Sequence, residues 1–150
     1  MKALFLDVDG VLNSEAWFVK QRRLKGRVDA CEVDPEPVMR ILNIVEATGA
    51  KIVLSSSWRN QPDLVEYLRS TGLPIHDMTP EVNAGFERHM DIIAWLDDNE
   101  DVKRFAIVDD DIDAGDHQRL RSSFVKTDAR YGLRGEHARK LIDILGVKGD

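Results

Sequence analysis

Two aspartates that follow an apolar run near the start of the chain carry the strongest chemical signal in the sequence. Residues 3–6 are Ala-Leu-Phe-Leu, and Asp7, Val8, Asp9 and Gly10 come directly after them. A short apolar run before a turn signal is typical of a buried strand. Because side chains alternate along a strand, Asp7 and Asp9 start on the same side, where two carboxylates need a cation or a shared proton. Gly10 then allows a turn with positive φ or a close approach of the backbone to a ligand.

Two further polar clusters follow apolar runs later in the chain. Serines 55–57 come after the run 51–54, and Asp109 and Asp110 come after the run 105–108. In an open parallel sheet, ligands bind outside the carboxyl ends of the strands, and these ends lie along one edge. Each cluster alone is also compatible with solvated polar residues at a strand end. Together, and in this order, the three clusters predict one acidic site.

The elements that must position these residues alternate between strands and helices. Strands are predicted at 3–6, 51–54, 105–108 and 123–126, with a shorter one at 73–77. Helices are predicted from apolar spacing at about 35–48, 60–71, 87–98 and 135–145, and a loop at 79–86. Asp34 and Gly49 are typical of the start and the end of the first of these helices. The alternation predicts an α/β fold, a Rossmann-like three-layer sandwich whose central parallel sheet has about five strands.

Residues 14–33 read as an insertion rather than as part of the sheet. Within them, the stretch 17–27 combines Trp17 and Phe18 with five basic residues. One interpretation is a solvated loop or short helix with a few packed aromatic side chains. The other is a small cap-like flap over the acidic strand end, whose cations meet an anionic substrate. Because the insertion is too small for a full cap domain, we expect a fairly open site.

Length and composition limit the class of protein. The chain has 150 residues, of which 43% are hydrophobic and 32% charged, which predicts a single domain over residues 1–150. The formal net charge of −6 argues against binding to long nucleic acids, although local basic patches are compatible with it. Cys31 is the only cysteine, which excludes an internal disulfide and a cysteine-based zinc site. Without a membrane-length apolar run or room for a signal peptide, we expect no membrane partner and a cytoplasmic location.

The polar clusters, taken in order, resemble the motifs of the haloacid dehalogenase-like (HAD) phosphohydrolase superfamily. Residues 7–13 are similar to its Asp-x-Asp-Gly opening, and the serines at the next strand end are similar to its second motif. Arg88 is the best match to the third motif, a basic residue that precedes the acidic strand. Asp109 and Asp110 match the fourth. This resemblance covers nearly the whole chain and implies the HAD-like fold.

A narrower resemblance is to the compact HAD domain of Swiss-army-knife RNA repair proteins. It rests on Ser-Ser-Ser-Trp-Arg at 55–59, Ile-Ile-Ala-Trp-Leu at 92–96, and the closing Gly-Leu…His-Ala segment at 132–138. One departure from the superfamily pattern is Asn13, which ends the first motif where many superfamily phosphatases carry Thr slightly earlier. This departure does not affect the two acids.

The superfamily resemblance implies a phosphatase that acts on phosphate monoesters. In such an enzyme Asp7 attacks the phosphorus and forms an aspartyl-phosphate, while Asp9 acts as general acid and then as general base. The resemblance implies that Arg88 stabilises the nucleophile and the transferred phosphoryl group. It also implies a serine hydroxyl that donates to the phosphoryl oxygens, for which both Ser55 and Ser56 are candidates; Lys103 and Arg104 are rivals of Arg88.

The resemblance further implies a Mg²⁺ cofactor. The expected ligands are Asp7, the backbone carbonyl of Asp9, and Asp109. Asp110 is expected either to bind the ion directly or to contact one of its ligands. Electrostatics support a cation independently, because two unit charges about 4 Å apart interact by roughly 4 kcal/mol at an effective dielectric near 20. A phosphate dianion would therefore be repelled by four carboxylates alone, and hard oxygen ligands favour Mg²⁺.

Other conspicuous side chains are assigned to packing or to the surface. The four histidines show no metal-ligand spacing. Trp17, Trp58 and Trp95 are expected to pack, and Trp17 alone is also a candidate for stacking on a substrate. Arg59 either faces the site or pairs with a nearby acid. Two acids are expected to belong to a loop rather than to the metal site, Asp111 and Asp113.

Two other classes of protein also cluster acids at strand ends. One is a phosphorelay receiver, in which the phosphorylated aspartate lies on a later central strand; here the first strand carries Asp-x-Asp-Gly. The other is a non-catalytic phosphate-binding regulatory module, although both candidate catalytic acids are present. For the substrate, the basic stretch 20–27 and the narrower resemblance favour a nucleotide or nucleic-acid end, and a phosphorylated small molecule remains an alternative.

Overall fold

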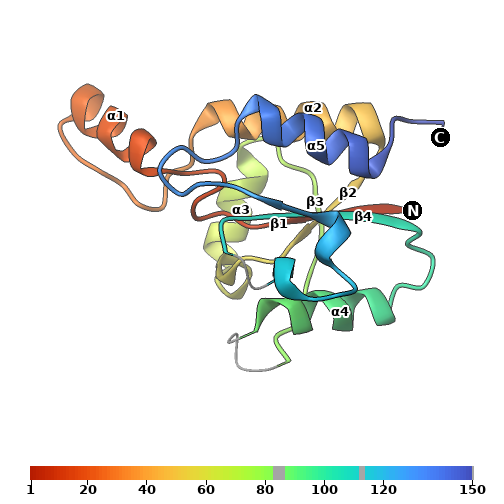
Figure 1. Cartoon of the computed structure of the whole chain (residues 1–150). Helices are drawn as coiled ribbons and strands as arrows, with labels where there is room; N and C mark the ends of the chain where they lie inside the picture. Colours follow the sequence, from red (N-terminus) through yellow and green to blue (C-terminus); the bar gives the residue numbers. More distant parts are fainter. Residues whose placement is uncertain (83–86, 112–113, 150) are drawn as a thin grey trace.

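The computed structural model of the chain describes residues 1–82, 87–111 and 114–149. The predicted loop at 79–86 is therefore described only as far as residue 82, and Asp113 lies outside the described residues. Within these ranges the chain forms one parallel sheet with helices on both of its faces (Figure 1). This confirms the predicted α/β, three-layer arrangement.

The sheet of the described chain has five parallel strands in the order β3-β2-β1-β4-β5. The strands are β1 (Lys2–Leu6), β2 (Lys51–Leu54), β3 (Ile75–Met78), β4 (Arg104–Asp109) and β5 (Phe124–Lys126). This order places β1 at the centre, paired on one side with β2 and on the other with β4. Because all the strands are parallel, the carboxyl ends of these three neighbours lie together at one edge of the sheet.

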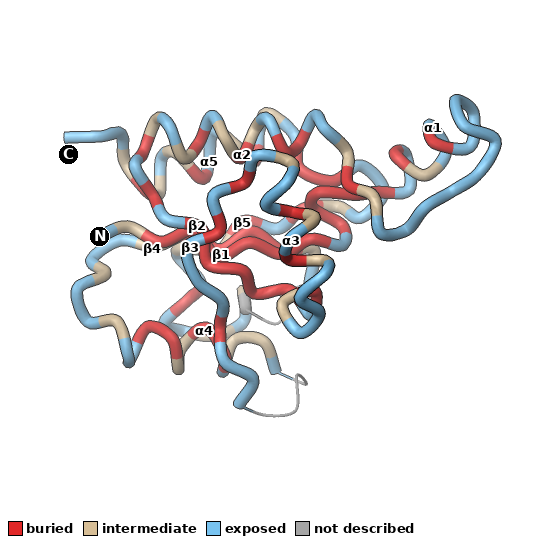
Figure 2. Tube along the Cα trace, turned by 180° about the vertical axis from the view of Figure 1, so that it is seen from behind, coloured by how far each residue is buried: buried red, intermediate tan, exposed pale blue. Residues whose placement is uncertain are grey.

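β1 is buried on both faces, as its unbroken apolar sequence predicts. Leu4 and Leu6 belong to the larger core, which lies on the side of α2, α3 and α5, whereas Ala3 and Phe5 belong to the smaller core beside α4. The ring of Phe5 meets that of Trp95 edge to face, with 5.4 Å between the ring centroids. The alternation of side chains along the strand thus joins both layers to the sheet, and the continuous burial of β1 is visible in Figure 2.

Most of the helices agree with the predicted spans. They are α1 (Glu15–Lys25), α2 (Pro35–Thr48), α3 (Pro62–Ser70), α4 (Arg88–Asp97) and α5 (Gly135–Leu145). As the sequence predicts, the side chain of Asp34 accepts from the backbone N–H of Glu36 at the start of α2, and Gly49 ends that helix in the left-handed conformation. Among the described residues, no helix combines the length and apolar character needed to cross a membrane.

One helix boundary differs from the sequence prediction. The helix predicted at 60–71 is α3, Pro62–Ser70, and a separate 3-10 turn, Ser57–Asn60, comes before it. Ser56 caps this turn, because its Oγ accepts from the backbone N–H of Trp58 at 3.1 Å. This turn ends at Asn60, and α3 begins at Pro62, since proline suits the first turn of a helix.

Residues 14–33 form an arm that projects from the carboxyl edge of the sheet, and α1 is its helix (Figure 1). Ser14 caps α1, since its Oγ accepts from the backbone N–H of Trp17 at 3.1 Å. The indole of Trp17 is buried, and its Nε1 donates to the backbone carbonyl of Glu32 at 3.0 Å. Trp17 therefore packs inside the arm and is not open to stacking on a substrate.

Candidate active site

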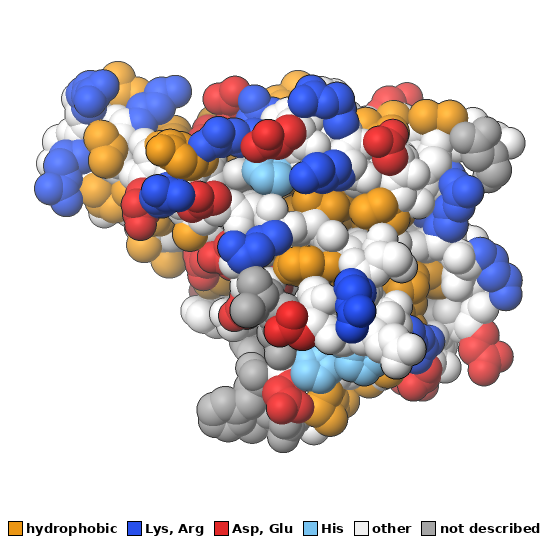
Figure 3. All heavy atoms as spheres, in the orientation of Figure 1, with side chains coloured by type: hydrophobic (Ala, Val, Ile, Leu, Met, Phe, Trp, Pro, Cys, Tyr) orange, Lys and Arg blue, Asp and Glu red, His pale blue; other side chains and the backbone are white. Residues whose placement is uncertain are grey.

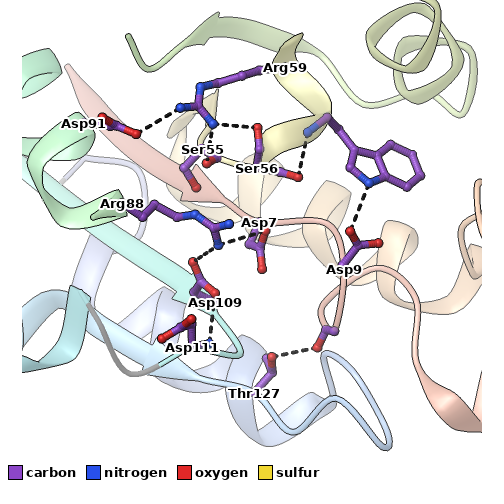
Figure 4. A network of polar contacts seen from close by, with 12 residues as sticks. Asp7, Asp9, Ser55, Ser56, Arg59, Arg88, Asp91, Asp109, Asp111 and Thr127 are labelled. Atoms are coloured by element: carbon purple, nitrogen blue, oxygen red, sulfur yellow. Dashed lines mark hydrogen bonds and ion pairs between the residues drawn. The ribbon is translucent and has the colours of Figure 1, made fainter. Parts of the chain in front are cut away.

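The carboxyl ends of β1, β2 and β4 bring the three predicted polar clusters together (Figure 4). Asp7 follows β1 directly, Ser55 follows β2 directly, and Asp109 is the last residue of β4. The backbone N–H of Asp7 donates to the carbonyl of Val108 at 3.2 Å, and that of Ser55 donates to the carbonyl of Leu6 at 3.0 Å. These bonds continue the sheet beyond β1 and β2, and so they hold Asp7 and Ser55 in register with the neighbouring strands.

Arg88, the first residue of α4, reaches two of the clustered acids. Its Nη1 lies 3.2 Å from Asp7 Oδ1 and 2.6 Å from Asp109 Oδ2, and both carboxylates are almost fully buried. The rival candidates Lys103 and Arg104 lie at the start of β4, at the opposite edge of the sheet from these acids. The structure therefore brings Arg88 to the acidic cluster and keeps its rivals away.

Three carboxyl groups share this site with one guanidinium. Burial, followed by the charge of Asp109, raises the pKa of Asp7 to about 9, and Arg88 opposes this shift. Burial and Asp109 also raise the pKa of Asp110. Burial by itself would lower the pKa of Arg88, but the carboxylates of Asp7 and Asp109 outweigh it and raise that pKa. Without a further positive charge, Asp7 therefore retains its proton at neutral pH.

The same carboxyl groups fit a divalent cation. Asp7, Asp109 and Asp110 each offer one ligand oxygen, and these oxygens lie within 4.8 Å of one another. Mg²⁺ binds oxygens at about 2.0–2.1 Å, so its ligand oxygens are roughly 3 to 4 Å apart, and the three carboxylates would draw together on binding it. Arg88 contacts one oxygen of Asp7, which leaves the other for a metal. A divalent ion would also supply the positive charge that the single guanidinium does not.

Asp9 lies apart from this cluster, with its side chain exposed. Its Oδ1 accepts a hydrogen bond from Asn13 Nδ2 at 2.9 Å, and its Oδ2 accepts one from Trp58 Nε1 at 3.2 Å. Asn13 is fixed in turn, because its Oδ1 accepts from the backbone N–H of Gly10 at 2.9 Å. The carboxylate of Asp9 is therefore oriented by two donors on the solvent side of Asp7. The metal-ligand prediction for Asp9 concerns only its backbone carbonyl.

The contact between Trp58 and Asp9 is a feature that sequence reasoning missed. Trp58 was expected to pack, and at 5% exposure its indole does so, but its ring N–H also reaches across 49 residues of sequence to the acid. One sequence signal could have indicated this contact: Trp58 comes directly after the serine cluster, and so it lies at the same edge of the sheet as Asp9.

Gly10 meets two requirements of the acidic loop. Its φ of +81° lies in the left-handed region of backbone conformation, which residues other than glycine rarely adopt. A Cβ on Gly10 would also collide with the carboxyl group of Asp110. In addition, the carbonyl of Gly10 accepts from Thr127 Oγ1 at 2.8 Å, which ties this loop to the residue after β5. Glycine thus allows Asp110 to approach the first acidic loop.

The two candidate serines occupy different environments. Ser56 Oγ is engaged as the cap of the 3-10 turn, where it accepts from the backbone N–H of Trp58. Ser55 Oγ is buried and has no hydrogen-bond partner among the described residues. A buried hydroxyl without a partner is unfavourable, so it is available to a ligand oxygen. This difference favours Ser55 over Ser56 as a phosphoryl donor.

Arg59 pairs with a buried acid, one of the two alternatives that the sequence left open. Its Nη2 donates to Asp91 Oδ2 at 2.9 Å, and the two side chains are only 6% and 2% exposed. Its remaining N–H groups donate to the carbonyl of Thr79 and to two carbonyls of the serine loop. Because Asp91 lies in the first turn of α4, this pair links the serine loop to the helix that positions Arg88.

Asp111 supports the site through its backbone, and His137 lies at the start of α5. The backbone N–H of Asp111 donates to Asp109 Oδ1 at 3.0 Å, which helps to orient that carboxylate. His137 is buried, and its Nδ1 accepts from the backbone N–H of Arg134 at the start of α5, in agreement with a structural role.

Residues 3–138 match the model of a family described as the HAD domain in Swiss Army Knife RNA repair proteins. The matched range contains all the site residues described above. No curated protein and no solved structure matches the chain.

Proposed function

The chain belongs to the family of HAD domains in Swiss Army Knife RNA repair proteins, and from this premise we propose that it is a Mg²⁺-dependent phosphatase that hydrolyses phosphate monoesters through an aspartyl-phosphate. Membership in this family indicates a phosphohydrolase-type function. The observation that supports the specific reaction best is the environment of Asp7. It is a buried carboxylate at the end of the central strand, paired with Arg88 and adjacent to Asp109 and Asp110.

In the first step, a carboxylate oxygen of Asp7 attacks the phosphorus of the monoester. A bond forms between this oxygen and phosphorus, and the bond from phosphorus to the leaving oxygen breaks. Because Asp7 attacks from the buried side, an in-line displacement sends the leaving oxygen toward the exposed side, where Asp9 lies. Asp9 donates a proton to that oxygen, and the product leaves as an alcohol.

In the second step, Asp9 acts as a base. It takes a proton from a water molecule whose oxygen attacks the phosphorus of the aspartyl-phosphate. The bond between phosphorus and the Asp7 oxygen breaks, which restores the carboxylate and releases inorganic phosphate. The hydrogen bonds from Asn13 and Trp58 orient Asp9 for both proton transfers.

The remaining residues counter the negative charge of the phosphoryl group. Mg²⁺ held by Asp7, Asp109, Asp110 and the backbone carbonyl of Asp9 would neutralise the phosphoryl oxygens and keep Asp7 ionised. Arg88 is placed to share its charge between the nucleophile and the transferred group, and the free hydroxyl of Ser55 donates to a phosphoryl oxygen.

We propose a nucleotide or a nucleic-acid end as the substrate. The support is the family description, which concerns RNA repair, together with the basic stretch 20–27 next to the site. We also propose a cytoplasmic location, because the exposed free thiol of Cys31 suits a reducing compartment. The phosphorelay-receiver alternative gains no support. A receiver carries its phosphorylated aspartate on a later strand at the centre of the sheet, whereas here the central strand is β1, the first strand, and Asp7 follows it.

The proposal is tested by hydrolysis of an aryl phosphate. We expect chelation of divalent metal to remove activity, Mg²⁺ to restore it, and Asp7→Asn to abolish it. Asp63→Asn, on the exposed surface of α3, is the matched control and should behave like the wild type. In Asp9→Asn, intact-protein mass spectrometry should detect a phosphorylated form that decays slowly. Full activity in chelator, or wild-type turnover in Asp7→Asn, would overturn the assignment.

A further inference from the structure

Positive charge is concentrated in two segments of this acidic protein. Residues 14–33 contain five basic and three acidic residues, and residues 126–140 contain five basic and two acidic residues. The rest of the chain holds 11 of the 21 basic residues but 22 of the 27 acidic ones. The net charge of −6 therefore does not describe these two segments, both of which are net positive.

The two segments are joined to each other and to the acidic loop. The backbone N–H of Glu15 donates to the carbonyl of Ala129, and that of Ala16 donates to the carbonyl of Arg130, each at 3.0 Å. The backbone N–H of Leu133 donates to the carbonyl of Val11 at 2.9 Å, within the first motif. Figure 1 accordingly shows the loop before α5 beside the start of α1. Both basic segments thus border the candidate active site.

The cations of the arm are exposed and mostly unpaired. Lys25 pairs with Glu32 at 2.6 Å. In contrast, Arg22, Arg23 and Arg27 are exposed and make no ion pair within the described part of the chain. We call these three arginines the basic arm, and Figure 3 shows the Lys and Arg side chains gathered over α1. Because no ion pair within the described residues engages them, their guanidinium groups are available to a partner.

The second segment adds an exposed aromatic ring to these cations. Tyr131 is 51% exposed, and the guanidinium of Arg134 lies over its ring, with Cζ 3.9 Å from the ring centroid. Arg130 lies farther from the ring, at 5.6 Å, and pairs with Asp128. We call Tyr131 and Arg134 the tyrosine platform. Tyr131 stays 51% exposed although Arg134 covers part of its ring, so a base can still stack on the exposed part while the cations contact phosphates, the combination that binds single-stranded nucleic acid.

We propose that the basic arm and the tyrosine platform bind a single-stranded polynucleotide whose phosphorylated end enters the site at Asp7. This inference rests on the function proposed above. The helix α1 has 11 residues and is therefore about 16 Å long, so the arginines at its far end lie well beyond a mononucleotide bound at Asp7. A strand of several nucleotides reaches them, and the surface selects a strand end over a free nucleotide.

The test compares two substrates in three sets of variants. The substrates are an aryl phosphate and a short single-stranded oligonucleotide with a terminal phosphate. The arm variant is Arg22→Gln/Arg23→Gln/Arg27→Gln, and the platform variants are Tyr131→Ala and Tyr131→Phe. A matched control removes three exposed cations that also make no ion pair within the described residues, by Lys51→Gln/Lys103→Gln/Arg121→Gln.

We expect the arm variant to raise KM for the oligonucleotide about tenfold at low salt. The slope of the logarithm of the binding constant against the logarithm of the salt concentration should become shallower by about 0.7 for each phosphate that the variant no longer neutralises. Tyr131→Ala should raise KM about tenfold, whereas Tyr131→Phe, which keeps the stacking ring, should stay near the wild type. Turnover of the aryl phosphate and the behaviour of the control variant should not change.

Direct binding separates this inference from the proposed function. In chelator, fluorescence anisotropy with an unphosphorylated oligonucleotide reports on the surface without any turnover. If the wild type binds this probe and the arm variant does not, the surface is supported even where aryl phosphate hydrolysis fails. Equal oligonucleotide affinity in the wild type, arm and control proteins would overturn the inference. A third substrate, an acidic phosphopeptide, is added for this purpose: an arm variant that loses turnover on the phosphopeptide and keeps it on the oligonucleotide would also overturn the inference, since the surface would then bind protein.

Discussion

Trp58 Nε1 donates a hydrogen bond to Asp9 Oδ2 at 3.2 Å, and this contact joins the loop after β2 to the loop after β1. Asn13 occupies the other oxygen of the same carboxylate. The acid that we propose for proton transfer is therefore oriented by one residue of its own loop and by one from a different strand end. Neither donor belongs to the acidic cluster, so both can be altered without removing a metal ligand.

Trp58→Phe keeps most of the buried aromatic volume and removes this donor. We expect kcat for an aryl phosphate to fall about tenfold, with little change in KM, because a general acid contributes only when it is positioned correctly. Trp95→Phe is the matched control: Trp95 is also buried, and its Nε1 donates to Asp77 at 2.8 Å on the other face of the sheet. A similar loss of kcat in both variants would show that Trp58 acts only through packing.

Replacing Ser55 and replacing Ser56 by alanine should have opposite effects on stability and on KM. Ser55→Ala should leave the free energy of unfolding nearly unchanged, since its hydroxyl has no hydrogen-bond partner among the described residues, and should raise KM for a phosphate monoester several-fold. Ser56→Ala removes the cap of a 3-10 turn and should cost about 1 kcal/mol of stability. Urea unfolding and steady-state kinetics on both variants distinguish these outcomes. The reverse pattern would make Ser56 the phosphoryl donor.

Gly10 and Gly26 provide a matched pair of glycines with positive φ, +81° and +71°. A Cβ on Gly26 meets no atom within 4 Å, whereas one on Gly10 meets the carboxyl group of Asp110. We expect Gly26→Ala to cost about 1 kcal/mol in stability, as the left-handed conformation alone predicts. Gly10→Ala should cost more and should also weaken Mg²⁺ binding, measured by calorimetric titration. Equal costs in the two variants would contradict the role of Gly10 in admitting Asp110.

The raised pKa of Asp7 predicts how the stability of the metal-free protein changes with pH. The pKa is about 9 in the folded chain against an ordinary value of 3.8, so between these values the folded state binds more protons than the unfolded state. The stability that this group contributes is therefore fully present below pH 3.8 and is lost as the pH rises to about 9. Denaturant unfolding in chelator should show this decline, and Asp7→Asn, which cannot ionise, should reduce it.

The same shift makes metal binding dependent on pH. Because the metal requires the ionised carboxylate, binding near neutral pH should release a proton from Asp7. Calorimetry in two buffers with different ionisation enthalpies measures this release directly. Binding without proton release at neutral pH would mean that Asp7 is already ionised in the metal-free protein.

Local sequence patterns were sufficient to predict most of the fold. The apolar runs at 3–6, 51–54 and 105–108 predicted the three central strands, because a strand covered on both faces must be apolar without interruption. Helix spacing and end signals predicted α2 and α5 closely. The predicted start of α3 was wrong because the capping by Ser56, a local hydrogen bond rather than a periodic pattern, formed a separate turn first.

What the sequence by itself determined was which residues stand at the carboxyl ends of parallel strands: Asp7, Ser55 and Asp109 follow or end apolar runs, and parallel topology brings such ends together. Only the tertiary structure decided how side chains from different strand ends pair. The indole of Trp58 contacts Asp9, Arg59 contacts Asp91, and Ser55 rather than Ser56 keeps a free hydroxyl. The physical reason is that hydrogen bonds depend on distance and angle within a fraction of an ångström. Residue types and spacing along the chain do not specify these distances and angles; the packing of separate elements does.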